Sequence, residues 1–435
     1  MTDVMPMKLD DLLHAEGPSP RQIERAYGAA RERFAAVGVD TEAAIQAALA
    51  VPISAHCWQA DDVMGLEAQE GVTDFGGLQT TGNYPGAART GDEIRADFQQ
   101  AAALIPGALR FNVHAMYAET GGRPVDRDQL APEHFARWID WCDAHGWGLD
   151  MNPTCFAHPM AADGMTLSHP KKRARDFWIR HCLACREIAR AIAMRLGECV
   201  CNIWLPDGLK DATVDRMGPR RLLIRALDQV LERRLRGVVD TVESKLFGIG
   251  VEDYTVGSHE FYLGYAVTRR VGICFDMGHY HPTETVADKI SAVAPFVPRI
   301  LLHVSRGVRW DSDHVTRFND ELRGVCDEVV RSGAMRQIIW ATDFFDASIN
   351  RIAAWVIGVR SVRKALLNAM LEPWEAAADA ERAGDGAVKL AIEEMRAELP
   401  FGAVWDQACL QADVPCSPDW LREIKDYEEQ ILSER

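Results

Sequence analysis

The chain has 435 residues, of which 48% are hydrophobic and 26% charged, and its formal net charge is −16. This composition indicates a soluble globular protein with a large core. The acidic excess excludes ordinary nucleic-acid binding, because phosphate contacts need clustered lysine and arginine. No apolar run of about 20 residues predicts a membrane span. The acidic start of the chain lacks the order of a secretory signal, so we expect a cytoplasmic protein with reduced cysteines.

Eight short apolar runs alternate with amphipathic segments along the middle of the chain. Each run is almost continuously apolar and becomes polar at its C-terminal end, which is typical of strands buried on both faces. The predicted strands are residues 51–58, 109–117, 147–155, 199–206, 237–247, 271–278, 299–305 and 337–345. Between them, apolar residues recur at helical spacing. The pattern predicts an α/β fold, a (β/α)8 TIM barrel over residues 51–370.

Two helical extensions flank the predicted barrel. Residues 1–50 contain the amphipathic stretch PRQIERAYGAARERFAAVG, and residues 371–435 are charged, rich in alanine and helical in pattern. We expect both extensions to pack on the barrel or to contact another subunit. The first strand–helix connection, residues 59–90, is long and rich in glycine, which is typical of loops that cover a ligand or touch a neighbouring subunit.

Carboxylates and histidines follow the last four predicted strands, at the end where barrel enzymes have their active sites. One strand ends with Glu243 and Lys245, which are two residues apart and therefore point to the same side. The later strand ends contribute Asp276, His279, His303, Asp311, Asp313 and Asp343. Crowded carboxylates repel one another unless a cation neutralises them. Mixed carboxylate and imidazole ligands favour Mn²⁺, Mg²⁺ or Co²⁺ over a cysteine-type zinc site.

The order of these side chains along the strands suggests two sets of metal ligands. The first set is Glu243, Asp276, His303 and Asp343, and the second is His279, Asp311 and Asp313, with positions open for substrate or water. Each residue alone has an ordinary explanation: the aspartates near 311 could be turn residues, and His303 could be a core histidine. Their joint position at the ends of consecutive strands favours the metal sites.

Aromatic and polar side chains end the earlier strands. Trp58 ends the first predicted strand, His114 lies near the end of the second and Trp204 lies near the end of the fourth. With Phe345, which ends the last predicted strand, the two tryptophans would form an apolar wall. These residues predict a pocket for a small polyol that has one apolar side.

Several long stretches resemble the L-rhamnose isomerase family. They include PISAHCWQADDV, TGNYPG, NPTCFAHP, NIWLPDGLKD, VESKLFGIG, FDMGHYHPTE, LLHVSRGVRWDSDH and DFFDASINRIAAWVIG. The resemblance implies a homotetrameric barrel enzyme of rhamnose catabolism that interconverts L-rhamnose and L-rhamnulose. It also implies two divalent ions per subunit, typically Mn²⁺, with Mg²⁺, Co²⁺ or Zn²⁺ as substitutes. The same seven residues would hold these ions.

The implied reaction moves hydrogen between C2 and C1 of an opened sugar, while metal ions stabilise charge on the sugar oxygens. Lys245 would polarise O1, and Asp311 or Asp343 would help to move the hydroxyl proton. The sugar would contact Trp58, His114, Trp204, Lys245 and Phe345. Transfer as a hydride and transfer as a proton through an enediol both remain open.

Three alternatives to this function follow from the same residues. An isomerase of the same class could act on L-mannose, L-lyxose or D-allose, because fold and metal site do not fix the substrate. A two-metal hydrolase would need cationic groups for phosphate, which the net charge of −16 disfavours. A binding protein without turnover would have no need of Lys245.

Overall fold

In a computed structural model of the protein, eight parallel strands form the central sheet. The structure describes residues 8–67, 82–211, 213–245, 253–281, 283–308 and 310–435, except for the side chains of residues 10, 310 and 311. The strands are β1 (Ile53–His56), β2 (Leu109–His114), β3 (Gly148–Asn152), β4 (Cys199–Trp204), β6 (Val238–Glu243), β8 (Gly272–Asp276), β9 (Ile300–Val304) and β12 (Ile338–Thr342). Their hydrogen-bonded order is β3-β2-β1-β12-β9-β8-β6-β4. All eight predicted strands are confirmed.

Side chains join the two ends of this strand order. The main-chain N–H of Val200 on β4 donates to Asp150 Oδ1 on β3 at 2.8 Å. Asn202 N on β4 likewise donates to Asn152 Oδ1 at 3.3 Å. Strands β3 and β4 therefore lie side by side. Here side-chain oxygens accept the main-chain hydrogen bonds that carbonyl oxygens accept in a regular sheet. The sheet nearly closes into a barrel, which confirms the predicted TIM-barrel fold.

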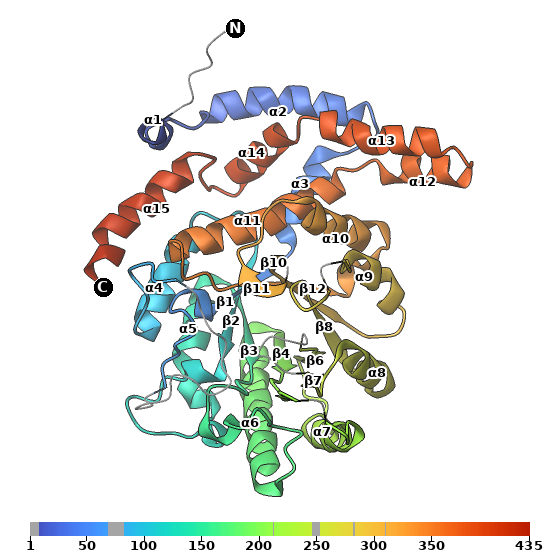
Figure 1. Ribbon diagram of the computed structural model, residues 1–435. Coiled ribbons are helices and arrows are strands. Elements are labelled where there is room, and N and C mark those ends of the chain that lie inside the picture. Colours follow the sequence, from blue (N-terminus) through green and yellow to red (C-terminus); the bar gives the residue numbers. More distant parts are fainter. Residues whose placement is uncertain (1–7, 68–81, 212, 246–252, 282, 309) are drawn as a thin grey trace.

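Eight helices follow the strands and surround the barrel (Figure 1). They are α4 (Gly91–Ala102), α5 (Ala136–His145), α6 (Lys172–Leu196), α7 (Met217–Val230), α8 (His259–Arg269), α9 (Ala287–Val293), α10 (Asp320–Arg331) and α11 (Arg351–Met370). Helix α11 begins directly after Asn350, whose side-chain oxygen accepts a hydrogen bond from Ala353 N at 2.9 Å. Such caps replace missing intrahelical partners and fix where a helix starts.

Short elements occupy the loops between strands and helices, and one 3-10 helix follows the last helix of the chain. The strands are β5 (Gly208–Leu209), β7 (Tyr254–Thr255), β10 (Arg306–Val308) and β11 (Trp310–His314). The 3-10 helices are η1 (Cys57–Gln59), η2 (Ala115–Tyr117), η3 (Arg127–Gln129), η4 (Pro132–Phe135), η5 (Pro159–Ala161), η6 (Ala334–Arg336) and η7 (Leu432–Glu434). Strands β10 and β11 form an antiparallel hairpin directly after β9.

Helices from both ends of the chain lie together on one side of the barrel (Figure 1). They are α1 (Leu9–Leu13), α2 (Pro20–Ala35), α3 (Thr41–Ala50), α12 (Trp374–Arg382), α13 (Gly386–Glu398), α14 (Phe401–Gln411) and α15 (Asp419–Gln430). A hydrophobic cluster joins α2 and α14 to the end of α11, with Phe34, Trp405 and Leu371 among its members. In the described chain, none of the helices is both long and apolar enough to cross a membrane.

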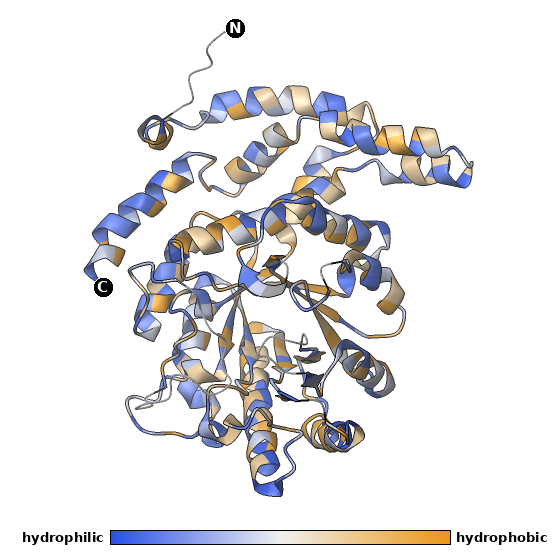
Figure 2. Cartoon of the chain, viewed as in Figure 1, coloured by the Kyte–Doolittle hydropathy of each residue, from blue (hydrophilic) through white to orange (hydrophobic). Residues whose placement is uncertain are grey.

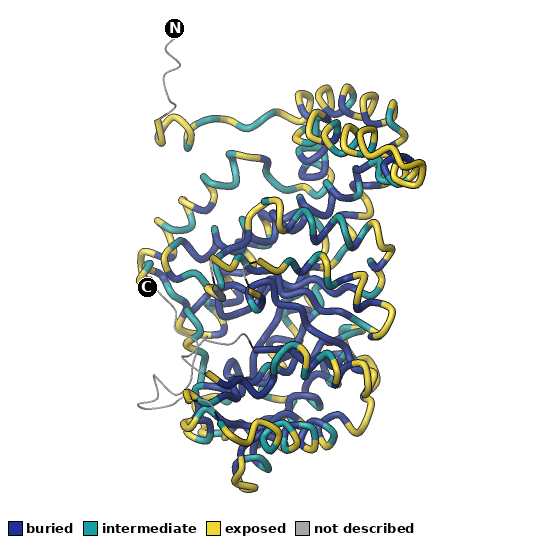
Figure 3. The backbone as a smooth tube through the Cα atoms, turned by 45° about the vertical axis from the view of Figure 1, so that its right-hand side comes forward, coloured by how far each residue is buried: buried dark blue, intermediate teal, exposed yellow. Residues whose placement is uncertain are grey.

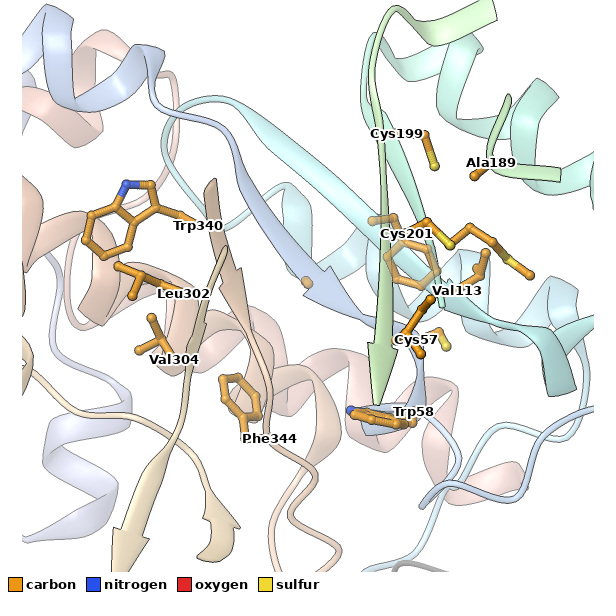
Figure 4. Packing of buried hydrophobic residues seen from close by; sticks show 14 of the residues in the cluster. Cys57, Trp58, Val113, Ala189, Cys199, Cys201, Leu302, Val304, Trp340 and Phe344 are labelled. Carbon is orange, nitrogen blue, oxygen red and sulfur yellow. The ribbon is translucent and has the colours of Figure 1, made fainter. Parts of the chain in front are cut away.

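Alternate residues of each strand build two separate cores. Outward-facing side chains such as Val113, Cys201, Leu302 and Trp340 pack in the main cluster (Figure 4). Inside the barrel, a small cluster contains Val200, Cys274, Leu301, Ile339 and Ala341. Hydrophobic residues follow the strands (Figure 2), and exposed residues lie mainly on the outer helices (Figure 3). All eleven cysteines are buried and free, as expected for core thiols.

Candidate active site

Four of the predicted metal ligands meet at the C-terminal end of the barrel. Glu243 ends β6, Asp276 ends β8, His303 lies on β9, and Asp343 directly follows β12. Each offers one ligand atom, and these atoms all lie within 4.8 Å of one another. Because these strands are neighbours in the sheet, their inward-facing ends converge. The four residues are all buried.

His303 lies at the centre of this group. Its Nδ1 is 2.8 Å from Asp343 Oδ2, 3.4 Å from Glu243 Oε2 and 3.7 Å from Asp276 Oδ2. Despite these short distances, neither ring nitrogen makes a well-directed hydrogen bond within the described chain. Asp343 Oδ1 is also buried without a hydrogen-bond partner there. Buried polar atoms are normally paired, so this donor set fits a divalent cation bound among the four side chains.

Neighbouring groups hold the carboxylates in place. Asp276 Oδ1 accepts hydrogen bonds from Gly278 N at 2.6 Å and from Ser305 Oγ at 3.3 Å. Glu243 Oε2 accepts a hydrogen bond from Asn202 Nδ2. Hydrogen bonds of this kind orient carboxylates that bind metals.

Burial and close contact together set the charges of the group. Burial raises the pKa of Glu243, but the nearby imidazoles of His303 and His279 outweigh it and lower this pKa far below its usual value. Burial also raises the pKa of Asp343, but the nearby His56 and His303 outweigh burial, so this pKa lies below its usual value. For His303, burial lowers the pKa, whereas Cys274, Glu243 and Asp343 raise it well above the usual value. The cluster therefore needs a positive charge at its centre, which an imidazolium or a cation can provide.

The second predicted ligand set is only partly described. His279 Nδ1 lies 3.2 Å from Glu243 Oε1, so it adjoins the first set. Asp313 lines the same cavity, and its φ of +43° lies in the left-handed region that few non-glycine residues adopt. Phe345 N donates to the Asp313 carbonyl at 3.2 Å. Asp311 is on β11, but its side chain lies outside the described residues, so its role as a ligand stays a prediction.

A cavity of about 460 Å³ lies next to these groups. Its lining consists of Trp58, His114, Asn152, Pro153, Phe156, Asn202, Trp204, Glu243, His279, His303, Asp313, Asp343 and Phe345. Four of the five predicted sugar contacts are thus on the cavity wall. The fifth, Lys245, is not in this lining; it is buried, and its Nζ donates to the Pro206 carbonyl at 2.9 Å. Its role toward the sugar stays a prediction.

Aromatic rings form one wall of the cavity. Trp58 stacks on His114 with ring centroids 4.2 Å apart, and Phe345 meets Trp58 edge to face at 5.7 Å. Trp204 meets Phe156 edge to face at 5.9 Å. The Nε1 atoms of both tryptophans and Nδ1 of His114 are buried without a hydrogen-bond partner in the described chain. An apolar wall with indole donors suits a polyol that has an apolar side.

Asn202 and Phe156 are among the lining residues that the sequence-based prediction did not include. Asn202 precedes Trp204 by two residues and therefore shares its inward face, so strand alternation alone could have identified it. Phe156 lies in the irregular segment after β3, where no periodicity indicates which side chains reach the cavity.

A model of the L-rhamnose isomerase family matches residues 21–435. This chain belongs to the L-rhamnose isomerase family. It is therefore an isomerase of the intramolecular oxidoreductase class. The L-rhamnose isomerase of Escherichia coli O81 (strain ED1a) is 53% identical over 417 residues, which cover 95% of this chain and 99% of the relative. That of Salmonella gallinarum is 52% identical with the same coverage.

Solved structures include more distant matches. A D-allulose 3-epimerase from Methylomonas sp. aligns with a TM-score of 0.44 and 9% identity, covering 75% of this chain and 97% of the epimerase. A likeness at this level carries no functional conclusion. Membership of the L-rhamnose isomerase family, in contrast, sets aside the two-metal hydrolase and the binding protein without turnover.

Proposed function

We propose that this chain interconverts L-rhamnose and L-rhamnulose by hydrogen transfer between C2 and C1 at a site for two divalent ions. The supporting observation is the convergence of four buried ligand atoms within 4.8 Å of one another beside a cavity of about 460 Å³ with an aromatic wall. The relatives that share 52–53% of their residues with this chain are named L-rhamnose isomerase.

Each of the two ligand sets at the strand ends binds one ion. In this proposal Glu243, Asp276, His303 and Asp343 hold one ion, and His279, Asp311 and Asp313 hold the other. Oxygen and imidazole ligands suit Mn²⁺, our proposed ion, as well as Mg²⁺ or Co²⁺. When bound, the ions supply Lewis-acid stabilisation of negative charge on the sugar oxygens.

The wall residues bind and orient the sugar. The indole N–H groups of Trp58 and Trp204, which lack partners in the described protein, donate to sugar hydroxyls. Phe345 and the ring of Trp58 pack against the apolar side of the sugar and exclude water from it. The pKa of His114 is far below its usual value because the ring is buried and lies beside His56, so His114 acts as a neutral ring.

Carboxylates transfer the protons of the sugar hydroxyls. Asp343 lines the cavity and its Oδ1 is buried without a hydrogen-bond partner in the described chain, so it can accept a hydroxyl proton. Asp311 is the second candidate, from the family resemblance. Lys245 holds O1 in this proposal; its ammonium group carries three N–H donors, one of which bonds to the Pro206 carbonyl.

A reconstitution assay tests the proposal. Chelated protein should form no ketose from L-rhamnose, and added Mn²⁺ should restore turnover. L-mannose, L-lyxose and D-allose, assayed in parallel, should give lower kcat/KM values. Activity that survives chelation would overturn the metal mechanism, and a higher kcat/KM for another aldose would overturn the substrate assignment.

We also propose that the enzyme is a homotetramer. The helical extensions at residues 8–50 and 371–435 carry exposed apolar side chains, including Val388 and Leu390 on α13, which suit subunit contacts. Light scattering should give about four times the chain mass of 48.4 kDa. A mass of one chain at micromolar concentration would contradict the proposal. The expected cytoplasmic location stays a prediction.

A further inference from the structure

Asn202 connects the cavity wall to the metal-ligand group. It is buried on β4, and its Nδ2 donates to Glu243 Oε2. Its Oδ1 accepts a hydrogen bond from Thr241 Oγ1 at 2.7 Å. Because an ionised carboxylate can only accept hydrogen bonds, the N–H side of the amide must face Glu243 and the oxygen must face Thr241. The orientation of the Asn202 amide is therefore defined by its partners.

The main chain of Asn202 is also held by a side chain of the neighbouring strand. Its N–H donates to Asn152 Oδ1 at 3.3 Å, across the boundary between β3 and β4 where side chains accept the hydrogen bonds. The Nδ2 of Asn152 in turn lies 3.2 Å from His114 Nε2 and 3.4 Å from His56 Nε2. One buried series of amides thus runs from His114 and His56 through Asn152 and Asn202 to Glu243.

The hydrogen bond from Asn202 Nδ2 restrains the terminal side-chain torsion of Glu243, which sets the directions of its two carboxylate oxygens. Glu243 Oε1 lies 3.2 Å from His279, in the second ligand set, while Oε2 lies 3.4 Å from His303, in the first. The terminal torsion of a glutamate is broad and has no strong intrinsic preference. A donor fixed on Oε2 therefore selects one carboxylate plane, with one oxygen near each ligand set.

We infer that Asn202 is a positioning residue, whose amide holds the Glu243 carboxylate in the plane required for divalent-cation binding. The inference rests on the proposed function, in which Glu243 is a metal ligand. Thr241 contributes by fixing the amide, and Asn152 by fixing the main chain of β4. Removing a hydrogen bond that orients a metal ligand lowers metal affinity by roughly 10- to 100-fold.

The experiment is a Mn²⁺ titration of the full-length protein, with free Mn²⁺ measured by electron paramagnetic resonance. Asn202→Leu keeps the approximate volume and removes the amide, whereas Thr241→Val removes only the hydroxyl that orients it. Asn112→Leu is the matched control, because Asn112 is another buried strand amide and its Oδ1 has no partner in the described chain. Thermal unfolding of the chelated proteins measures any effect on the fold alone.

We expect Asn202→Leu to weaken one class of Mn²⁺ sites by roughly 10- to 100-fold, and Thr241→Val by a smaller factor. Asn112→Leu should bind Mn²⁺ like the wild type, even if it unfolds at a lower temperature. Wild-type affinity in Asn202→Leu would overturn the inference; if that variant does not fold, wild-type affinity in Thr241→Val would do so. A wild-type protein that binds no Mn²⁺ would instead overturn the proposed metal site.

Discussion

Arg351 binds Asp62 at two points, with Nε 3.0 Å from Oδ1 and Nη2 2.5 Å from Oδ2. Its Nη1 also donates to the carbonyl oxygens of Tyr84 and Pro85, at 2.8 Å and 2.9 Å. Asp62 and Val63 have φ values of 59° and 61°, in the left-handed region that is costly for a β-branched residue. One buried guanidinium therefore joins the two flanks of the connection between β1 and α4 and stabilises a strained turn near Trp58.

Replacing Arg351 by Met should lower the free energy of unfolding by about 3–5 kcal/mol, because Asp62 would remain largely buried without its partner. Urea unfolding measures the effect. Arg382→Met is the control, since Arg382 and its partner Asp379 are both exposed and such pairs contribute about 0–1 kcal/mol. Equal losses in the two variants would contradict the role given to Arg351.

His181 on α6 should make the stability depend on pH. It is fully buried, its Nε2 accepts from Thr154 N at 3.1 Å, and its Nδ1 lies 2.9 Å from the Arg127 carbonyl. Burial lowers the pKa of His181 to about 3. In the unfolded chain the pKa returns to about 6.5, so between these values the unfolded state binds a proton that the folded state does not. The stabilising contribution is therefore complete above about pH 6.5 and is lost as the pH falls toward 3.

From these pKa values, His181 alone should lower the free energy of unfolding by about 2 kcal/mol between pH 7 and pH 5. Urea unfolding of the wild type and of His181→Gln at both pH values measures this contribution. The variant should be less stable at pH 7 but should lose less stability on acidification. Parallel pH dependences for the two proteins would show that His181 does not titrate in this way.

The positions of the strands could be predicted because buried parallel strands have a simple apolar pattern. The run at 271–278, for example, contains β8 (Gly272–Asp276), and the polar residue that ends it is part of the ligand group. Likewise, Glu243, His303 and Asp343 could be identified because inward-facing residues at C-terminal strand ends must converge in a barrel. Periodicity and chain position together were sufficient for these features.

Contacts between distant residues could not be predicted. Asp150 accepts hydrogen bonds from Ser54 Oγ at 2.7 Å and from Arg110 Nη2 at 2.6 Å, which are 96 and 40 residues away in the chain. No local pattern indicates that side chains join β3 to β4, or that the Nζ of Lys245 bonds to Pro206. Such features depend on how the strands are placed beside one another, and each strand alone carries no signal for them.

The negative charge of Asp150 should stabilise the join between β3 and β4. It pairs with Arg110 and accepts a hydrogen bond from Val200 N at 2.8 Å. In Asp150→Asn the charge of Arg110 loses its partner in the barrel interior, so we expect a loss of about 3–5 kcal/mol in unfolding free energy. The amide of Val200 should also exchange faster with deuterium than in the wild type.

Asp143→Asn is the control for Asp150, because Asp143 pairs with Arg195 at the surface. It should leave the exchange of Val200 unchanged and alter stability by at most about 1 kcal/mol. If Val200 remains fully protected in Asp150→Asn, the join between β3 and β4 does not depend on this carboxylate.

Replacing Asp311 by Asn should abolish isomerase turnover and leave the fold intact. In the proposed function this residue holds the second ion and takes part in proton movement, and both roles need a carboxylate. A ketose assay with saturating Mn²⁺ and a circular dichroism spectrum test the two parts of the expectation. Ser312→Ala, a change at the next residue of the same hairpin, should keep turnover. Substantial activity in Asp311→Asn would remove Asp311 from the proposed site.

Phe345 should favour L-rhamnose over L-mannose, which carries a hydroxymethyl group where L-rhamnose carries a methyl group. The ring lies edge to face with Trp58, 5.7 Å between centroids, on the apolar wall of the cavity. Loss of that contact should penalise the methyl-bearing sugar more than the hydroxylated one, because the latter gains access to water. In Phe345→Ala we therefore expect the ratio of the two kcat/KM values to fall roughly tenfold.

Phe318→Ala is the matched control for this change in specificity. Phe318 is 37% exposed and stacks on Phe401 with ring centroids 5.5 Å apart, and it is not part of the cavity lining. Its removal should leave the ratio of kcat/KM values unchanged. If Phe345→Ala lowers kcat/KM equally for both sugars, the ring contributes to the shape of the cavity but does not distinguish the methyl group from the hydroxymethyl group. The preference for L-rhamnose would then have to come from the two tryptophans of the wall.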